Sequence, residues 1–466
     1  MHLMHLTIAF ISLLFLAAIM NWKEDIKNFF ERINLPSIDY IGDRILVIVP
    51  HPDDETIGTA GIIQRAIKLK KPILLIVVTS GEAYKKAAIA FFKKAKLTSE
   101  DYYKFGLKRQ QETINAMELL GLRRENIIFL GFSDGTMKFL WSQNWSKNFP
   151  KVSSTTKVNY VPYDTAYKKG ISYTGQSVVE VLSEIIDNFK PTDIYYPVSD
   201  DMHPDHSAVH NFVKYVILSK NLNLNEHQFL VHHPEWPVPW GSDINKAMLP
   251  PTDMVKSNTT WESFVLEKDE ILTKHSAILK YKTQTEMMKP FLMAFIRKTE
   301  LFCKKPIIII PTLDNMPDLE TYINKNPILR LYAGGVLEEE IYKSAALTRF
   351  SAFKFKDTLY LGIESAKPIS KKVLYRFEMR FFDKDDNIKR IDFGIINEVF
   401  NQYKFSENSL IESYTDKPII YKNKMWVPVR IPDVKTLKYI FIGVDSIYKN
   451  KFIDKIPWNI YKIKNN

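Results

Sequence analysis

Hydrophobic runs alternate with amphipathic segments through the first part of the chain. Residues 45–50 and 73–78 are almost wholly aliphatic, as is typical of strands buried on both faces of a parallel sheet. Because strands alternate with helices, we expect an α/β fold, a Rossmann-like parallel sheet with helices on both faces. The same pattern predicts strands at 126–130, 193–196 and 229–232, and helices at 56–70, 177–189, 206–219, 266–280 and 283–298.

The pattern changes after residue 302, where short alternating runs replace the helical periodicity. Short strands separated by turn residues are typical of an all-β sandwich. We therefore expect the α/β domain to span 41–302 and a C-terminal, all-β sandwich-like module to span 303–466. Its predicted strands lie at 306–311, 353–362, 373–382, 388–393, 425–431 and 439–447.

Two segments without periodicity, 137–173 and 234–261, interrupt the α/β pattern and are rich in aromatic residues. Long irregular segments inside a compact domain are usually functional loops. Their aromatic side chains would either stack on sugar rings or pack the loops onto the domain. The sequence leaves both interpretations open.

The N-terminal segment, 1–40, begins with a run of apolar and small residues at 6–20, and the first charged side chain is Lys23. Extended to 3–22, the run approaches the ~20 residues that a bilayer-spanning helix needs. Because basic residues before the run and a small-residue cleavage site are missing, we expect an uncleaved, single-pass membrane anchor rather than a signal peptide. A buried helix of a soluble domain is the alternative, and the side of the membrane stays open.

Composition indicates a globular protein, because 45% of the residues are hydrophobic and 25% are charged. The length of 466 residues indicates two or three domains. The net charge of +11 is spread along the chain, and no nucleic-acid-binding motif accompanies it. We interpret the excess as a solvated basic surface, with attraction to an anionic membrane or an acidic polysaccharide as the alternative. Cys303 is the single cysteine, which excludes an internal disulfide, and no cysteine-nucleophile constellation accompanies it.

Two polar motifs follow predicted strands, His-Pro-Asp-Asp-Glu at 51–55 and His-Pro-Asp-His at 203–206. In parallel sheets, ligands bind beyond the carboxyl ends of the strands, so both motifs should meet at one edge. Imidazole and carboxylate groups are the ligands of hydrolytic Zn²⁺ sites, which leave one position open for water. The two motifs therefore predict a hydrolytic metal site.

Further motifs follow in order along the chain: Thr-Ser-Gly-Glu at 79–82, Arg-Gln-Gln-Glu at 109–112, Phe-Leu-Gly-Phe-Ser-Asp-Gly at 129–135 and a late helix at 274–284. Together with the two histidine motifs, this ordered set resembles the PIG-L/LmbE-like family of zinc-dependent N-acetylglucosamine deacetylases. The resemblance covers residues 44–301 and does not extend to the β module, for which carbohydrate binding and simple packing are both admissible.

The resemblance implies specific roles for the residues that match the family motifs. His51, Asp54 and His206 would hold the Zn²⁺ ion, although Fe²⁺ or Co²⁺ would also suit nitrogen and oxygen ligands. Asp53 would act as the general base and later as the acid that protonates the leaving amine. His203 would face the developing oxyanion, with Asp205 orienting its ring and keeping it protonated.

Other residues receive less specific expectations. By the same resemblance, Arg109 and Asp134 would contact substrate hydroxyls. Glu55 would cap or support the following helix. His232 and His233, at the end of a predicted strand, would either add an imidazole to the site or serve packing or substrate contact.

The function expected from this resemblance is hydrolysis of the N-acetyl amide of an N-acetylated amino sugar, within a lipid-linked or polymeric glycan. One alternative is an amidase acting on a small thiol-precursor glycoside or another non-sugar amide. A second is an inert glycan-binding protein on the same fold. The sequence gives no indication of the oligomeric state.

Overall fold

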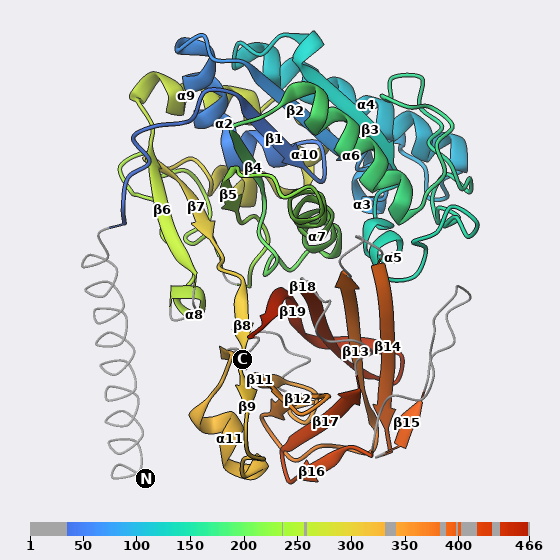
Figure 1. Cartoon of the computed structure of the whole chain (residues 1–466). Helices are drawn as coiled ribbons and strands as arrows, with labels where there is room; N and C mark the ends of the chain where they lie inside the picture. Colours follow the sequence, from blue (N-terminus) through green and yellow to red (C-terminus); the bar gives the residue numbers. More distant parts are fainter. Residues whose placement is uncertain are drawn as a thin grey trace, which may run out of the picture.

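The computed structural model describes residues 35–234, 236–255, 259–330, 342–382, 388–397, 399–401, 417–430 and 439–464. Within these residues an α/β domain lies above a β module in the view of Figure 1. The two parts meet along one side of the α/β domain, and the chain passes from one to the other between β7 (Thr299–Lys304) and β8 (Ile308–Ile310).

The α/β domain is built on a seven-stranded sheet of order β3-β2-β1-β4-β5-β7-β6. The strands β3, β2, β1, β4 and β5 are parallel, whereas β7 pairs antiparallel with both β5 and β6 at one edge. In the centre of the sheet, Ile45 is in register with both Ile73 and Asp193. Besides β7, the strands of this sheet are β1 (Ile45–Val49), β2 (Ile73–Thr79), β3 (Ile127–Phe132), β4 (Asp193–Pro197), β5 (Asn225–Phe229) and β6 (Thr260–Val265).

Helices cover both faces of this sheet because the aliphatic residues of β1 serve two cores. Val47 packs into a cluster that includes Ile63 of α2, whereas Leu46 packs into a second cluster with Leu182 and Val213. The predicted parallel sheet with flanking helices is thereby confirmed. The helices are α2 (Asp54–Lys68), α3 (Lys85–Phe92), α4 (Ser99–Leu119), α5 (Met137–Ser142), α6 (Gly175–Phe189), α7 (Pro204–Ser219), α8 (Thr252–Val255), α9 (Lys268–Ile278) and α10 (Lys282–Met293), with a short 3₁₀ helix at Arg124–Asn126.

The C-terminal module contains two six-stranded sheets. One has the order β10-β11-β12-β17-β16, with β9 pairing on β11, and the other has the order β15-β14-β13-β18-β19-β8. Leu361 of the first sheet and Phe377 of the second belong to one buried cluster, so the two sheets share a core, as a sandwich does. The elements are β9 (Thr312–Leu313), α11 (Leu319–Lys325), β10 (Leu329–Arg330), β11 (Leu347–Phe355), β12 (Thr358–Ser365), β13 (Val373–Phe382), β14 (Ile388–Ile396), β15 (Val399–Asn401), β16 (Ile419–Tyr421), β17 (Lys424–Arg430), β18 (Tyr439–Tyr448) and β19 (Lys451–Ile463).

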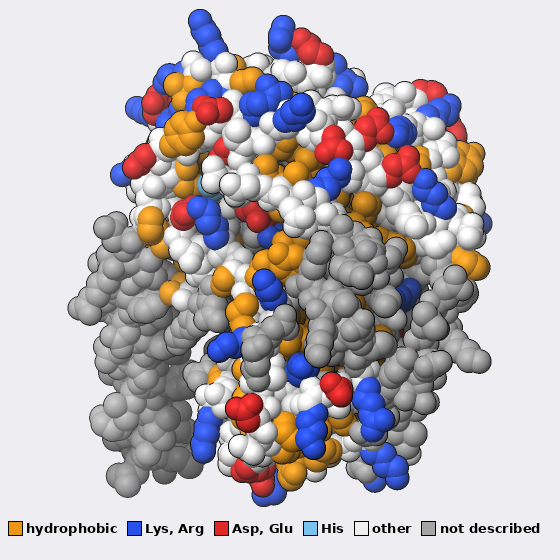
Figure 2. All heavy atoms as spheres, viewed as in Figure 1, with side chains coloured by type: hydrophobic (Ala, Val, Ile, Leu, Met, Phe, Trp, Pro, Cys, Tyr) orange, Lys and Arg blue, Asp and Glu red, His pale blue; other side chains and the backbone are white. Residues whose placement is uncertain are grey.

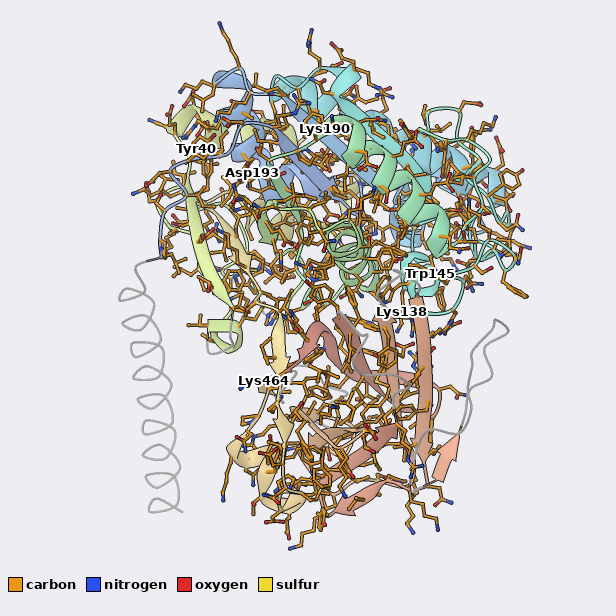
Figure 3. All side chains as sticks on the ribbon, in the orientation of Figure 1. Tyr40, Lys138, Trp145, Lys190, Asp193 and Lys464 are labelled. Carbon is orange, nitrogen blue, oxygen red and sulfur yellow. The ribbon has the colours of Figure 1, made fainter. Side chains whose placement is uncertain are left out.

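The module docks on α5 and α7 through an aromatic contact. The buried ring of Trp141 lies 5.3 Å from that of Phe441 and 5.8 Å from that of Trp458, centroid to centroid. Lys138 and Trp145, labelled in Figure 3, mark this boundary, and Lys138 is paired with Asp445 of β18. The module and the α/β domain thus share apolar surface and are not merely tethered.

The predicted N-terminal anchor at 6–20 falls outside the described residues. In the part of the chain that the structure describes, no helix combines the length and the apolar character needed to cross a bilayer. The predicted single-pass membrane location is therefore corrected, because no described helix supplies the span.

Two predicted strands differ from the structure for identifiable reasons. The segment 353–362 was expected to be one strand but forms the β11–β12 hairpin, with Lys356 in the left-handed region at φ 51°. The segment 229–232 was expected to be a strand, but the strand is β5, which lies earlier and carries mostly polar side chains. Hydrophobicity alone does not locate such a strand.

The excess of basic residues follows the predicted pattern on the face shown in Figure 2. Lys and Arg side chains are spread over both the α/β domain and the module there, and acidic side chains lie among them. This arrangement fits a solvated basic surface better than a binding patch.

Candidate metal centre

Three side chains at the carboxyl end of the sheet point potential ligand atoms at one another. His51 follows β1, Asp54 is the first residue of α2, and His206 lies in the first turn of α7. The Nδ1 atom of His51 lies 3.2 Å from His206 Nε2 and 3.3 Å from Asp54 Oδ2. His206 Nε2 lies 3.1 Å from Asp54 Oδ2. The three atoms therefore form a nearly equilateral triangle.

This triangle has the size of one face of a tetrahedral metal site. With metal–ligand bonds of about 2.0–2.1 Å, neighbouring ligands of a tetrahedral Zn²⁺ ion lie roughly 3.3 Å apart. All three side chains are buried, with 6% or less of their residue surface exposed. Two imidazole nitrogens and one carboxylate oxygen suit Zn²⁺, and also Fe²⁺ or Co²⁺. The residues predicted from the two histidine motifs therefore fit a divalent metal ion.

Asp201 orients His206 from behind. Its Oδ2 lies 3.0 Å from His206 Nδ1 and also accepts hydrogen bonds from the backbone N–H groups of Val231 and His232. Burial opposes its ionisation, but the His206 imidazole lowers the pKa of Asp201 well below its usual range. A carboxylate on one imidazole nitrogen leaves the other free to bind a metal.

The sequence did not single out Asp201. The available signal was the acidic pair Asp200 and Asp201 just before the second motif, but spacing alone does not say which carboxylate turns inward. In the structure Asp200 forms an ion pair with Lys305, whereas Asp201 is fully buried.

The surroundings of His206 are strongly negative. Burial opposes protonation of its ring, yet the charges of Asp201 and Asp54 raise the pKa of His206 to about 9. A buried position that stabilises positive charge to this extent is suited to a cation.

His51 is flanked on its second nitrogen by two more carboxylates. Its Nε2 lies 3.2 Å from Asp134 Oδ1 and 3.5 Å from Asp205 Oδ2. Asp134 also accepts a hydrogen bond from the backbone of Ala83, and Asp205 accepts one from that of Gly135. Both carboxylates are thus placed against a proposed metal ligand, whereas the sequence suggested a substrate contact for Asp134.

Asp205 contacts His203 through its backbone. The Asp205 N–H donates to His203 Nδ1 at 3.3 Å, while its carboxylate faces His51. Burial, assisted by the neighbouring imidazoles, lowers the pKa of His203 well below its usual value. This direction favours the neutral ring of His203, whereas the resemblance implied a protonated ring.

Asp53 is held in a strained conformation next to the three ligands. Its φ angle of 115° lies where non-glycine residues are rare, at a cost of about 1–3 kcal/mol. Its backbone N–H donates to Glu55 Oε2, and its Oδ2 accepts a hydrogen bond from Arg109 Nη2 at 3.2 Å. Burial raises the pKa of Asp53 to about 8, although the charge of Arg109 opposes this shift.

Arg109 is buried and fastens the loops around Asp53. Its guanidinium donates to the carbonyl oxygens of Gly81, at 2.7 Å, and Pro52, at 2.5 Å, in addition to Asp53. A side chain at position 81 would collide with it, because a Cβ there would lie 2.1 Å from Arg109 Nη1. The described contacts of Arg109 are therefore internal, whereas the sequence suggested contact with substrate.

A fourth imidazole, His232, completes the group. Its ring centroid lies 4.9 Å from that of His206 and 5.3 Å from that of His203. Together with Asp54 and His206 it forms a second set of atoms close enough to share an ion. Burial lowers the pKa of His232 to about 4, so its ring is neutral near pH 7.

The late helical segment stabilises the first motif from outside. Tyr281 donates a hydrogen bond to Glu55 Oε1 at 2.6 Å, and Lys274 donates to the Ile57 carbonyl oxygen at 2.9 Å. Thr283 donates to Glu112 of α4. Glu55 is thus a buried structural partner, as expected from its position.

Comparison with solved structures gives distant similarity to deacetylases. The N,N'-diacetylchitobiose deacetylase from Pyrococcus horikoshii is 17% identical, covering 56% of this chain and 84% of that one, with a TM-score of 0.34. The A40926 pseudoaglycone deacetylase Dbv21 is also 17% identical, covering 56% and 96%, with a TM-score of 0.36.

Two Bacillus proteins are similar in sequence to part of this chain. The probable N-acetyl-alpha-D-glucosaminyl L-malate deacetylase 2 of Bacillus subtilis (strain 168) is 29% identical over 168 residues, which make up 36% of this chain and 57% of that protein. The protein of the same name from Bacillus anthracis is 26% identical over 160 residues, 34% of this chain and 66% of that one. The chain thus matches less than two thirds of the length of either relative.

A family model matches the part of the chain that carries both histidine motifs. The model is that of PIG-L, GlcNAc-PI de-N-acetylase, and it matches residues 46–217. These residues contain all three atoms of the ligand triangle together with Asp53, Arg109, Asp134, His203 and Asp205. The resemblance found in the motifs is confirmed: residues 46–217 match the PIG-L family model, and the Bacillus relatives are named as deacetylases.

Proposed function

We propose that this protein is a metal-dependent N-deacetylase that hydrolyses the N-acetyl amide of an N-acetylated amino sugar. The observation that carries the proposal is the buried triangle of His51 Nδ1, Asp54 Oδ2 and His206 Nε2, which has the size of a tetrahedral ligand face. The family match and the glucosaminyl malate deacetylases among the relatives support the amide and the sugar.

An amide resists hydrolysis because its carbonyl is a poor electrophile and its amine a poor leaving group. His51, Asp54 and His206 would hold a divalent ion, which would supply Lewis acidity and lower the pKa of a water molecule. What remains for the protein is to accept a proton from the attacking water, stabilise charge on the former carbonyl oxygen and protonate the amine.

Asp53 is placed for the proton transfers. It adjoins Asp54 in the chain, and the hydrogen bond from Arg109 together with the strained backbone fixes the direction of its carboxylate. We assign to it both steps, first taking the proton of the attacking water and then giving a proton to the departing nitrogen.

His203 is placed to stabilise the oxyanion as a neutral donor. Because its Nδ1 accepts the Asp205 N–H, the ring proton of the neutral form lies on Nε2. The ring lies 4.5 Å from that of His51, centroid to centroid, so this N–H adjoins the ligand triangle. A fixed N–H donor aimed at developing charge needs no reorganisation during the reaction.

We further propose that the acetylated sugar is part of a larger conjugate. Phe291 stacks on His232 at 6.0 Å, and the ring of Trp240 lies 6.3 Å beyond Phe291. Trp240 is 64% exposed although it is a large apolar side chain. A row of rings from the metal centre to the surface offers a platform for the part of a substrate that lies beyond the reacting sugar.

Release of acetate from purified full-length protein tests the proposal. We expect acetate from N-acetylglucosaminyl conjugates such as the malate glycoside, the phosphatidylinositol glycolipid or diacetylchitobiose. Asp53→Asn should abolish it while the bound zinc stays stoichiometric. Zinc-loaded protein that releases no acetate from any amino-sugar conjugate would contradict the proposal. Acetate from non-sugar amides alone would favour the amidase, and glycan binding without hydrolysis would favour the inert alternative.

A further inference from the structure

Two lysines at the C-terminal module contact the loop 199–203, which lies next to the metal centre. We infer that Lys455 and Lys305 are positioning residues that hold the loop 199–203, and through Asp201 the metal-binding imidazole of His206. The inference rests on the proposed metal centre but is independent of which amide is hydrolysed.

Lys455 contacts the loop directly beneath Asp201. It projects from β19, and its Nζ donates to the Asp201 carbonyl oxygen at 2.9 Å and to Ser207 Oγ at 3.0 Å. The Ser207 hydroxyl itself lies 2.9 Å from the Asp201 carbonyl oxygen and 3.0 Å from that of Ser199. One ammonium group thus joins the loop to the first turn of α7, next to His206.

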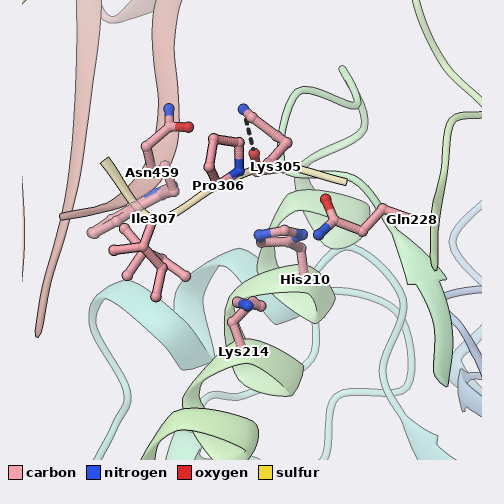
Figure 4. A pocket seen from close by; sticks show the side chains of 10 residues that line it. His210, Lys214, Gln228, Lys305, Pro306, Ile307 and Asn459 are labelled. Atoms are coloured by element: carbon pink, nitrogen blue, oxygen red, sulfur yellow. Dashed lines mark hydrogen bonds between the residues drawn. The ribbon is translucent and has the colours of Figure 1, made fainter. Parts of the chain in front are cut away.

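Lys305 holds the other end of the same loop. It lies between β7 and β8, where the chain passes into the module, and its Nζ lies 2.7 Å from Asp200 Oδ2 and 3.1 Å from Ser199 Oγ. Figure 4 shows a pocket that Lys305 lines together with His210 and Gln228 of the α/β domain and Asn459 of β19. Its side chain is only 12% exposed, so water screens this ion pair poorly.

These contacts matter because Asp201 binds the imidazole of His206 and the backbone of His203. Its Oδ2 holds His206 Nδ1 at 3.0 Å, and its Oδ1 accepts the His203 backbone N–H at 2.9 Å. The lysines bind the backbone carbonyl of Asp201 and its neighbours, so they fix the place from which its carboxylate acts. Groups hydrogen-bonded directly to a metal ligand, as Asp201 is to His206, are commonly worth a factor of about 10–100 in metal affinity or activity, and the lysines act one step further out.

The interface also contains a lysine that makes no described contact with this loop. Lys138 of α5 pairs with Asp445 of β18 and lies over the ring of Phe452. It bridges the same two parts of the molecule at another point. Lys138→Met is therefore a matched control, because it removes a lysine from the interface while leaving the loop 199–203 alone.

The test compares Lys455→Met, Lys305→Met and Lys138→Met with the parent in the full-length protein. Zinc affinity is measured by competition with a chelating dye, and kcat and KM are measured separately on an N-acetylglucosaminyl conjugate. We expect Lys455→Met to weaken zinc binding about tenfold and to lower kcat with KM unchanged, Lys305→Met to do so less, and Lys138→Met to change neither. Lys455→Arg should restore most of the affinity.

Unchanged zinc affinity in Lys455→Met and Lys305→Met would overturn the inference, as would an equal loss in Lys138→Met, since that would indicate general loosening of the interface. Should Lys455→Met not fold, Lys305→Met and Lys455→Arg carry the same comparison. Parent protein that binds zinc but releases no acetate would contradict the proposed reaction, while the affinity series would still decide this inference.

Discussion

His206 and Asp201 share a hydrogen bond of 3.0 Å between Nδ1 and Oδ2, with both side chains fully buried. We predict that Asp201→Asn, which keeps the shape but removes the charge, weakens zinc binding about 10- to 100-fold. Zinc titration of the metal-stripped protein measures the effect. Asp187→Asn, which alters an exposed carboxylate paired with Lys220, should leave the affinity unchanged. Equal affinities for both variants would exclude an orienting role for Asp201.

Gly81 allows Arg109 to reach Asp53. We predict that Gly81→Ala displaces the guanidinium, because the new Cβ would lie 2.1 Å from Nη1, and that deacetylation falls at least tenfold. Gly170 offers a control with a similar positive φ, +81° against +63°, and no atom within 4 Å of an added Cβ.

Both substitutions introduce backbone strain of about 1–2 kcal/mol, but only the first introduces the collision. Urea unfolding together with acetate release should therefore show a modest loss of stability in Gly170→Ala with full activity. If the two variants lost activity equally, backbone strain and not Arg109 would be the cause.

Asp454 makes the stability of the protein depend on pH. Burial raises its pKa to about 6, even though it accepts hydrogen bonds from the backbone N–H groups of Leu347 and Lys455. The unfolded value is about 3.9, so between pH 4 and 6 the folded state binds more protons, and stability falls as pH rises. A difference of about two units between the folded and unfolded pKa values corresponds to about 3 kcal/mol of stability at most.

We predict that Asp454→Asn makes the free energy of unfolding less dependent on pH in this range. The variant should lose less stability than the parent between pH 4.5 and pH 7. Urea midpoints measured at several pH values provide the test. Asp357→Asn, in the exposed β11–β12 turn, serves as the control. If the profiles of the parent and of Asp454→Asn ran parallel over this interval, Asp454 would be ionised in the folded state.

Trp240 is predicted to contribute to the binding of large substrates. Loss of a stacking contact of about 1 kcal/mol should raise KM roughly fivefold for an extended conjugate in Trp240→Ala. The small substrate N-acetylglucosamine should be affected much less, because it does not reach beyond Phe291. Phe149→Ala removes another exposed aromatic ring and should raise neither value. Equal effects on large and small substrates would argue against the platform.

The positions of parallel strand ends predicted that the two histidine motifs meet, and the family resemblance implied which of their residues are the ligands. His51 follows an aliphatic strand that every pattern rule recognises, and His206 follows β4, its neighbour in the sheet. The partners of these ligands were less accessible to prediction. Whether Asp134 turns to substrate or to His51 depends on the path of the loop after β3, which no periodicity determines.

The predicted strand boundaries were wrong where the sequence lacks the usual turn and hydrophobicity signals. The β11–β12 turn is made by Lys356 and Asp357, with neither glycine nor proline, so the hairpin resembled one long strand. The strand β5 was not predicted at its true position because the side chains of His227 and Gln228 are polar, although they are buried in the structure. In both cases tertiary contacts outweighed local preference.

The packing of Trp141 against Phe441 and Trp458 has a practical consequence for the expression of shortened forms of the protein. A fragment that contains only residues 46–217 would lack both Phe441 and Trp458. The apolar surface around Trp141 would then be exposed to water, and we expect such a fragment to aggregate during expression. If such a fragment were inactive, aggregation would explain the result, and nothing would follow about the metal centre.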